Sequence, residues 1–166
     1  MTKPYSNKLL PDMLPNDFRK KTLIINLTGT MIDHSYKFYT GFEILKRPGL
    51  QRFINEMGQY YEVIVFGTED SSFVEEVCSK LDKNEMNIRY KLGKEATCYE
   101  NGRYVKDLRY INRNMKNVVV IDYDIENLKY DKYNTIILPK FEGDTADRDL
   151  IQIIPFLKGK GILFNI

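Results

Sequence analysis

Short apolar runs alternate along the chain with segments of helical periodicity, and this alternation constrains the fold most strongly. The runs are TLIIN (22–26), EVIVF (62–66), NVVVID (117–122) and TIIL (135–138). Runs of this length that are apolar on both faces are typical of strands buried in a parallel sheet. Helical segments between such strands indicate βαβ units. The sequence therefore predicts an α/β fold, a Rossmann-like parallel sheet flanked by helices.

Helical spacing of apolar residues marks the segments expected to be helices. They are LQRFINEM (50–57), EDSSFVEEVCSKL (69–81) and TADRDLIQIIPFLKG (145–159). Glu69 and Asp70 open the second segment, where carboxylates suit the positive end of the helix dipole. In the third, Pro155 is expected either to kink the helix or to lie in its first turn.

A β-hairpin is expected as an insertion ahead of the strand at 117–122. Residues 97–106 read TCYENGRYVK, and the pair Asn101-Gly102 is a strong signal for a two-residue hairpin turn. The run IRYKL (88–92), which precedes this segment, is expected to be a further strand.

The first 20 residues differ in composition from the remainder of the chain. They contain three prolines and scattered polar residues, so we expect an extended N-terminal arm over 1–20 and a single domain over 21–166. Leu9, Leu10 and Leu14 are candidates for pinning this arm to the domain.

Net charge, cysteine spacing and the length of the apolar runs exclude some classes of binding partner. A net charge of +2 in 166 residues is too close to neutral to indicate nucleic acid as the main partner. Cys78 and Cys98 lack metal-ligand spacing and are expected to be small buried hydrophobes. No apolar run approaches the ~20 residues of a membrane span, and no signal-peptide core is expected in the first 18 residues. Membrane association is expected through partners or an upstream anchor.

Carboxylates are frequent where the predicted strands end, the edge at which open parallel sheets bind ligands. They are Glu69, Asp70, Asp122, Asp124, Glu126, Glu142 and Asp144. Such a cluster is consistent with a Mg²⁺ site for phosphoryl transfer. It is equally consistent with a surface that attracts a cationic peptide or protein. A third interpretation is that these acids are helix caps and a solvated rim.

Several motifs, taken in order, resemble the NIF/FCP-homology domain of the haloacid dehalogenase superfamily. They are IINLTGT, KRPG, YYEVIVFGTE, GRYVKDLRYINR, VVVIDYD and IPFL, and together they cover nearly the whole chain. KRPG and VKDL place the chain only in the broad family. LLPD, LTG, KDLRYINRN and GDTADRDLIQIIPFL are closer to the family's presequence-receptor branch, in the mitochondrial inner-membrane translocase, than to its active phosphatases.

The resemblance implies a degenerate catalytic motif after the first strand. Phosphatases of the family carry D-x-D-x-T there, in which the first aspartate attacks phosphorus and the second is the general acid and base. In this chain those positions are Asn26 and Thr28, and only Thr30 is retained. An amide is a poor nucleophile, and a hydroxyl is a poor proton shuttle near neutral pH.

The resemblance also implies residues that hold the phosphate and the metal, and two of these positions carry a different residue in this chain. Gly67 stands where a phosphate-holding Ser or Thr is expected, and Tyr123 stands where an Asn should follow the metal-binding acid Asp122. Lys106 matches the lysine that neutralises the phosphoryl group, and we expect it to pair with Asp122 or another neighbour. We therefore expect no catalysis, no bound metal and no cofactor.

The resemblance implies a receptor that binds mitochondrial presequences and the translocase's channel subunit. It would lie at the mitochondrial inner membrane and face the intermembrane space. The peptide-binding candidates are Glu69, Asp70, Asp124, Glu142 and Asp144, with Phe66, Phe73, Tyr90, Leu92 and Tyr99 as apolar contacts. Two alternatives remain open: a structural subunit of another inner-membrane assembly, and a residual Mg²⁺-dependent phosphatase that uses Thr30 or Asp33.

Overall fold

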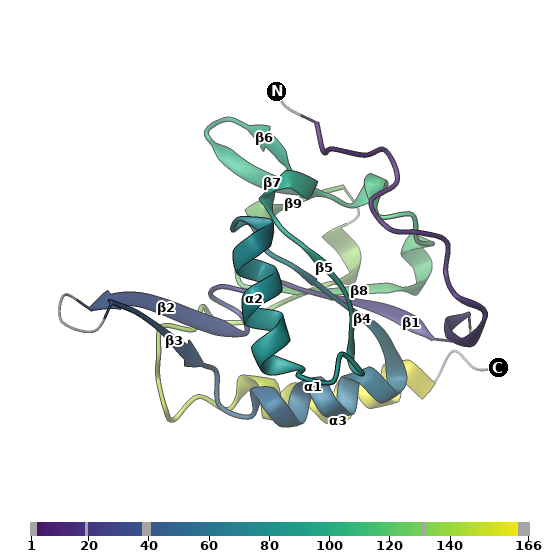
Figure 1. Cartoon of the computed structure of the whole chain (residues 1–166). Helices are drawn as coiled ribbons and strands as arrows, with labels where there is room; N and C mark the ends of the chain where they lie inside the picture. Colours follow the sequence, from purple (N-terminus) through teal and green to yellow (C-terminus); the bar gives the residue numbers. More distant parts are fainter. Residues whose placement is uncertain (1–2, 19, 38–40, 131, 163–166) are drawn as a thin grey trace.

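A parallel sheet forms the centre of the computed structural model, which describes residues 3–18, 20–37, 41–130 and 132–162 (Figure 1). Its strands are β1 (Lys21–Ile25), β4 (Tyr61–Phe66), β5 (Ile88–Leu92), β8 (Val118–Asp122) and β10 (Thr135–Ile137). Their order is β10-β8-β1-β4-β5, and each neighbouring pair is parallel. The predicted fold class is therefore confirmed.

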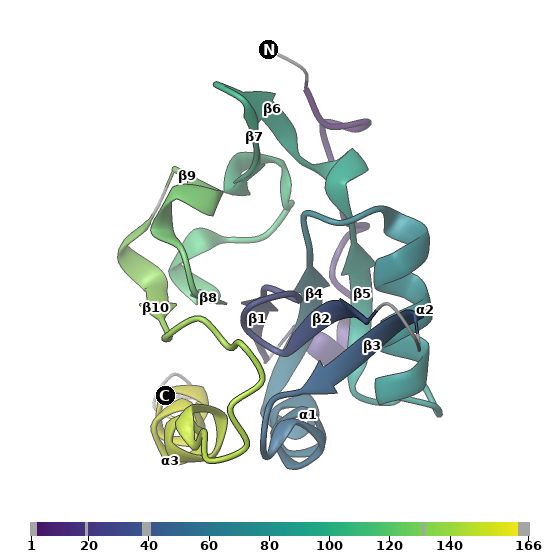
Figure 2. The ribbon, with the colours of Figure 1, turned by 90° about the vertical axis from the view of Figure 1, so that its left-hand side faces the viewer.

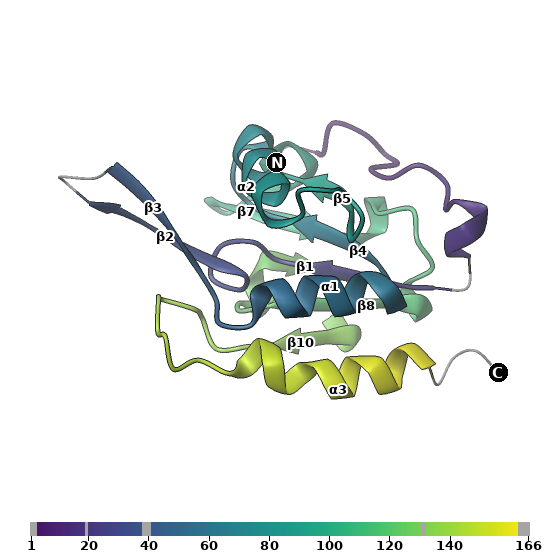
Figure 3. The same ribbon diagram turned by 60° about the horizontal axis from the view of Figure 1, so that its bottom comes forward.

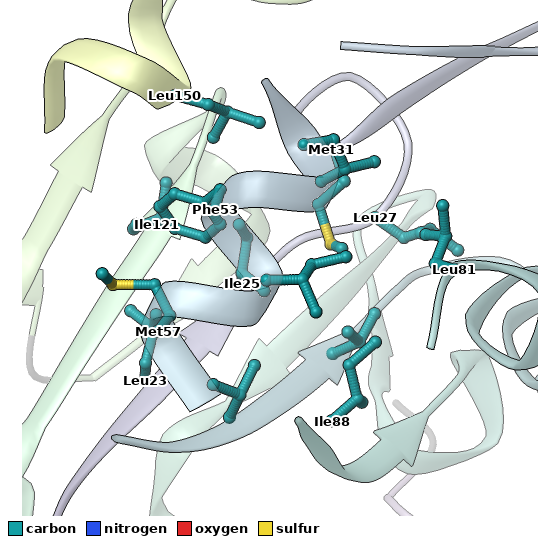
Figure 4. Packing of buried hydrophobic residues seen from close by; sticks show 14 of the residues in the cluster. Leu23, Ile25, Leu27, Met31, Phe53, Met57, Leu81, Ile88, Ile121 and Leu150 are labelled. Atoms are coloured by element: carbon teal, nitrogen blue, oxygen red, sulfur yellow. The ribbon is translucent and has the colours of Figure 1, made fainter. Parts of the chain in front are cut away.

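Helices α1 (Leu50–Tyr60), α2 (Ser71–Leu81) and α3 (Asp149–Ile162) contribute to one core on one face of the sheet. In β1, Leu23 and Ile25 point into this core, whereas Ile24 points to the opposite face, as strand alternation requires. Figure 4 shows Phe53 of α1 among these side chains. Helices α1 and α3 run side by side beneath the sheet (Figure 3). Pro155 lies inside α3, beyond its first turn.

The opposite face of the sheet is covered by the N-terminal arm and by short 3₁₀ segments. Leu9 and Leu10 are 7% and 1% exposed and pack with Leu108 and Ile111 in a second core. The arm is fastened by its backbone, since the Leu9 amide donates to the carbonyl of Tyr110 at 2.8 Å. Leu14, the third candidate for pinning the arm, is 47% exposed and contributes little.

The expected inserted hairpin is present as β6 (Cys98–Glu100) and β7 (Arg103–Asp107). Asn101 and Gly102 have φ angles of 50° and 82°, the left-handed conformations that a type I′ turn requires. Strand β7 also pairs in parallel with the short strand β9 (Leu128–Lys129). Figure 2 shows this unit on the side of the sheet away from α1 and α3.

A second hairpin was not predicted. Strands β2 (Ile32–Lys37) and β3 (Gly41–Lys46) pair antiparallel and project from the body of the domain (Figure 1, Figure 3). The residues between them carry no Asn-Gly or Asp-Gly pair, so the strongest sequence signal for a hairpin is missing. Within the described ranges, no helix has the length and apolar character needed to cross a membrane.

Candidate functional site

Lys106 joins the carboxyl ends of two central strands. Its ammonium donates to Oδ1 of Asn26, which follows β1, and to Oδ2 of Asp122, the last residue of β8, both at 2.7 Å. Asn26, Lys106 and Asp122 are 3%, 1% and 0% exposed. The expected pairing of Lys106 with Asp122 is confirmed. The Lys106 ammonium is therefore bonded to groups of the protein and is not accessible to a ligand.

The amide of Asn26 is also committed. Its Nδ2 donates to the carbonyl oxygen of Thr28 at 2.6 Å and to Oγ1 of Thr30 at 3.2 Å. Asn26 therefore stabilises the turn after β1 with the nitrogen and accepts from Lys106 with the oxygen. The Thr28 hydroxyl oxygen is buried and has no hydrogen-bond partner among the described residues.

The second oxygen of Asp122 is fully engaged by its own loop. Oδ1 accepts from the backbone amides of Tyr123 and Asp124, at 2.8 and 3.2 Å, and from Nδ2 of Asn127 at 3.2 Å. The resemblance implies a Mg²⁺ ligand at this position in active phosphatases, and Mg²⁺ requires several free oxygen ligands in near-octahedral geometry. One carboxylate with both oxygens in use, beside an ammonium, does not fit that ion.

Two glycines are in close contact with larger side chains: Gly67, which follows β4, and Gly29, in the turn after β1. A Cβ on Gly67 would lie 2.2 Å from Oε2 of Glu69, so the Glu69 carboxyl fills the space that a Ser or Thr at position 67 would need. A Cβ on Gly29 would lie 2.6 Å from the ring of Tyr123, which therefore packs directly against this turn. Both glycines thus allow close approach by a neighbouring side chain.

A surface cavity of about 390 Å³, here called the hairpin cavity, lies between β2, β7 and the start of α2. Its lining residues are His34, Thr68, Glu69, Asp70, Phe73, Lys94 and Tyr104. Lys94 forms an ion pair with Asp70, and its backbone amide donates to the Glu69 carbonyl at 2.7 Å. The rings of His34 and Phe73 meet edge to face with centroids 5.5 Å apart.

Sequence reasoning named Glu69, Asp70 and Phe73 of this cavity as candidates, but it did not point to His34, Lys94 and Tyr104. His34 lies on β2, and the hairpin that carries it to the cavity was not predicted. Lys94 and Tyr104 lie in segments that meet α2 only through the tertiary fold. Their sequence neighbourhoods gave no signal for this site.

The remaining acidic candidates lie outside the hairpin cavity. Asp124 caps a 3₁₀ turn through the Glu126 amide at 2.9 Å and lies 3.6 Å from Arg103. Glu142 pairs with Lys140 at 3.4 Å, and Asp144 accepts from the backbone amide of Ala146 at 2.8 Å. For these acids the structure matches the third interpretation, caps and a solvated rim.

Some of the apolar candidates pack in the core of the domain, and one is exposed beside the hairpin cavity. Phe66 and Leu92 are 0% and 6% exposed and belong to the second core, against which the half-buried Tyr90 also packs. They are therefore packing residues, and Leu92 is not available to a peptide. Tyr99 is 42% exposed, and its ring centroid lies 5.0 Å from that of Tyr104, a cavity residue.

Known proteins resemble this chain over most of its length. "Mitochondrial import inner membrane translocase subunit tim50" of Aspergillus fumigatus is 39% identical over 155 residues, which are 93% of this chain and 31% of the relative. The Arabidopsis thaliana protein "Mitochondrial import inner membrane translocase subunit TIM50" is 34% identical over 157 residues, 95% of this chain and 42% of the relative. The chain thus spans less than half the length of these curated relatives.

The fold has a solved counterpart. The structure of Fcp1, "an essential RNA polymerase II CTD phosphatase", superposes with a TM-score of 0.65 and 16% sequence identity, over 87% of this chain and 52% of that one. At this identity the likeness concerns the fold alone. The family model described as "NLI interacting factor-like phosphatase" matches residues 21–162. The chain belongs to the NLI interacting factor-like phosphatase family.

Proposed function

We propose that this protein is a non-catalytic receptor subunit of the mitochondrial inner-membrane translocase, facing the intermembrane space. It binds presequences, together with the channel and other subunits of that complex. It associates with the membrane by binding those partners or by means of an anchor outside this sequence. The names of its relatives, which are inner membrane translocase subunits, support this assignment.

The absence of catalysis is supported chiefly by the bonding of Asn26. An amide stands where the family's phosphatases carry their nucleophile, and both of its polar atoms are engaged by Lys106, Thr28 and Thr30. A carboxylate nucleophile attacks phosphorus with a free lone pair, which this amide does not offer. Lys106 is neutralised by Asp122 and is not positioned to stabilise charge on a transferring phosphoryl group.

Presequence binding is supported by the mixed lining of the hairpin cavity. A presequence is a basic amphipathic helix, so its receptor needs carboxylates for one face and apolar surface for the other. Glu69 and Asp70 provide the first, and Phe73 and Tyr104 provide the second. Because the whole chain carries a net charge of +2, attraction of a cationic peptide must come from this local arrangement.

A titration tests the receptor role. A fluorescent synthetic presequence, with a scrambled version of equal charge as control, is titrated with the protein at low and high salt. We expect saturable binding that weakens as salt is raised, because exposed charge pairs are screened. No salt-sensitive binding at high micromolar peptide would contradict the proposal.

A phosphatase assay and a purification separate the alternatives. We expect no turnover of an aryl phosphate with Mg²⁺; turnover that requires Mg²⁺ and is lost in Asp122→Asn would identify a residual enzyme. Purification from native mitochondria should recover translocase subunits. Recovery of a different inner-membrane assembly would indicate a structural role there.

A further inference from the structure

Glu69 brings into the hairpin cavity a carboxylate with one oxygen that has no hydrogen-bond partner among the described residues. Its Oε2 is buried and accepts no hydrogen bond from any residue in the described part of the chain. A buried carboxylate oxygen without a donor is unfavourable and strengthens its attraction for an incoming cation. Gly67 lets this oxygen stay in place, because any side chain at position 67 would collide with it.

The other charges of the cavity balance each other. Lys94 forms an ion pair with Asp70, which removes both from consideration as the principal contact of a ligand. Among the described lining residues, Glu69 is then the acid whose charge is not neutralised. The cavity therefore fits a ligand group that carries a single positive charge.

Aromatic rings make up much of the remaining wall. The rings of His34, Phe73 and Tyr104 line the cavity beside the carboxylate. Planar guanidinium groups stack on aromatic faces and donate to carboxylates through a rigid fork, whereas an ammonium is a strongly hydrated point charge. A carboxylate among aromatic rings thus favours arginine over lysine.

We propose that the hairpin cavity holds one arginine side chain of the bound presequence, with its guanidinium donating to Glu69 and lying against the rings of Phe73 and Tyr104. This inference rests on the proposed function and identifies the contact within it. The cavity volume, about 390 Å³, accommodates one long side chain rather than a helix. The rest of the peptide lies over the cavity mouth, where the exposed Tyr99 adjoins Tyr104.

Glu69→Gln tests the contact. It keeps the size of the side chain and removes its charge. The matched control is Glu76→Gln, on the exposed side of α2, where Glu76 pairs with Lys80 outside the cavity. Binding of an arginine-containing synthetic presequence is measured by fluorescence anisotropy. We expect Glu69→Gln to weaken binding about tenfold, equivalent to about 1.4 kcal/mol, and Glu76→Gln to change it less than about twofold.

A peptide series identifies the partner of Glu69. Each arginine in turn is replaced by citrulline, which keeps the shape of the side chain without its charge. One replacement is expected to weaken binding to the wild type about tenfold and to have little further effect on Glu69→Gln, because both changes remove the same contact. Replacing that same arginine by lysine should recover only part of the loss.

The outcomes separate this inference from the proposed function. Wild-type affinity in Glu69→Gln, or a citrulline effect of equal size in both proteins, overturns the arginine site while presequence binding stands. Absence of salt-sensitive binding in the wild type overturns both. Thermal unfolding of Glu69→Gln should match or exceed that of the wild type, since the unsatisfied buried charge is removed.

Discussion

The ammonium of Lys106 and the carboxylate of Asp122 form an ion pair 2.7 Å long in which the side chains are 1% and 0% exposed. Removing one member of such a pair leaves the other charge buried without compensation, which typically costs about 3–5 kcal/mol. We therefore expect Lys106→Met to lower the free energy of unfolding by that amount in urea titrations. The double variant Lys106→Met/Asp122→Asn should recover part of the loss. A loss below about 1 kcal/mol in the single variant would contradict this role.

Placing at position 26 the aspartate that the resemblance implies for active phosphatases should destabilise this protein. In Asn26→Asp the donor that bonds the Thr28 carbonyl at 2.6 Å is replaced by an oxygen, and the bond to Thr30 is lost as well. We expect a destabilisation of about 1–3 kcal/mol, the usual cost of breaking buried hydrogen bonds. No phosphatase activity should appear, because Thr28 and Tyr123 still stand at two further positions where the resemblance implies a general acid and base and a metal-site Asn.

The control for this variant is Asn84→Asp, the same chemical change at an exposed loop position. It should alter the unfolding free energy by less than about 0.5 kcal/mol. Equal losses in the two variants would show that the turn bonds of Asn26 do not matter for stability.

Arg47 fastens the loop before α3 to the rest of the domain. Its buried guanidinium contacts Asp147 at 2.8 Å and Asp149 at 2.7 Å, and it donates to the carbonyls of Thr30 and Pro139 at 3.2 and 3.0 Å. Lysine cannot reproduce this fork of donors. Arg47→Lys should therefore cost about 3 kcal/mol in chemical unfolding, since it breaks a buried charge network.

Arg52→Lys is the comparison for Arg47→Lys. Arg52 is exposed and pairs with Glu56 one helical turn away. Exposed pairs contribute little, so the change should remain within about 0.5 kcal/mol. If Arg47→Lys were equally mild, the network at Arg47 would not be holding the loop.

Because the phenol of Tyr61 is buried, we expect the free energy of unfolding to fall at alkaline pH. Burial raises the pKa of its phenol from 10.0 to about 12, and the hydroxyl donates to the Leu157 carbonyl at 2.6 Å. The folded protein thus favours the neutral phenol. Its contribution to stability is complete below pH 10 and is lost as the pH rises towards 12.

Unfolding of Tyr61→Phe across this pH range checks the assignment. The variant should be less stable by about 1 kcal/mol near pH 8, because one hydrogen bond is missing. Its stability should fall less steeply than that of the wild type above pH 10. Parallel pH profiles for the two proteins would show that another group titrates.

The central strands were predictable from sequence because burial on both faces leaves apolar runs of strand length, and these runs are separated by segments of helical periodicity. The segments 22–26, 62–66 and 117–122 coincide with β1, β4 and β8 within one residue. The β2–β3 hairpin was not predictable in the same way, because it projects from the domain and lacks the usual turn residues. Its register depends on pairing that no short sequence window displays.

The candidate site was predictable only in part, for a related reason. The positions of Asn26, Lys106 and Asp122 follow from motifs at strand ends, and the fold brings those ends together. Glu142 and Asp144 were placed on the same edge, but the path of a long loop is set by its own turns and ion pairs. The hairpin cavity depends on His34, whose position follows from the unpredicted hairpin.

The N-terminal arm lies outside the match to the family model but inside the packed core of the domain. The family model begins at residue 21, whereas the packed interior already includes Leu9 and Leu10. A fragment that began at residue 21 would lose two side chains that pack over Leu108 and Ile111 in the second core. The part of the chain that packs into the interior of the domain is therefore longer than the part that the family model matches.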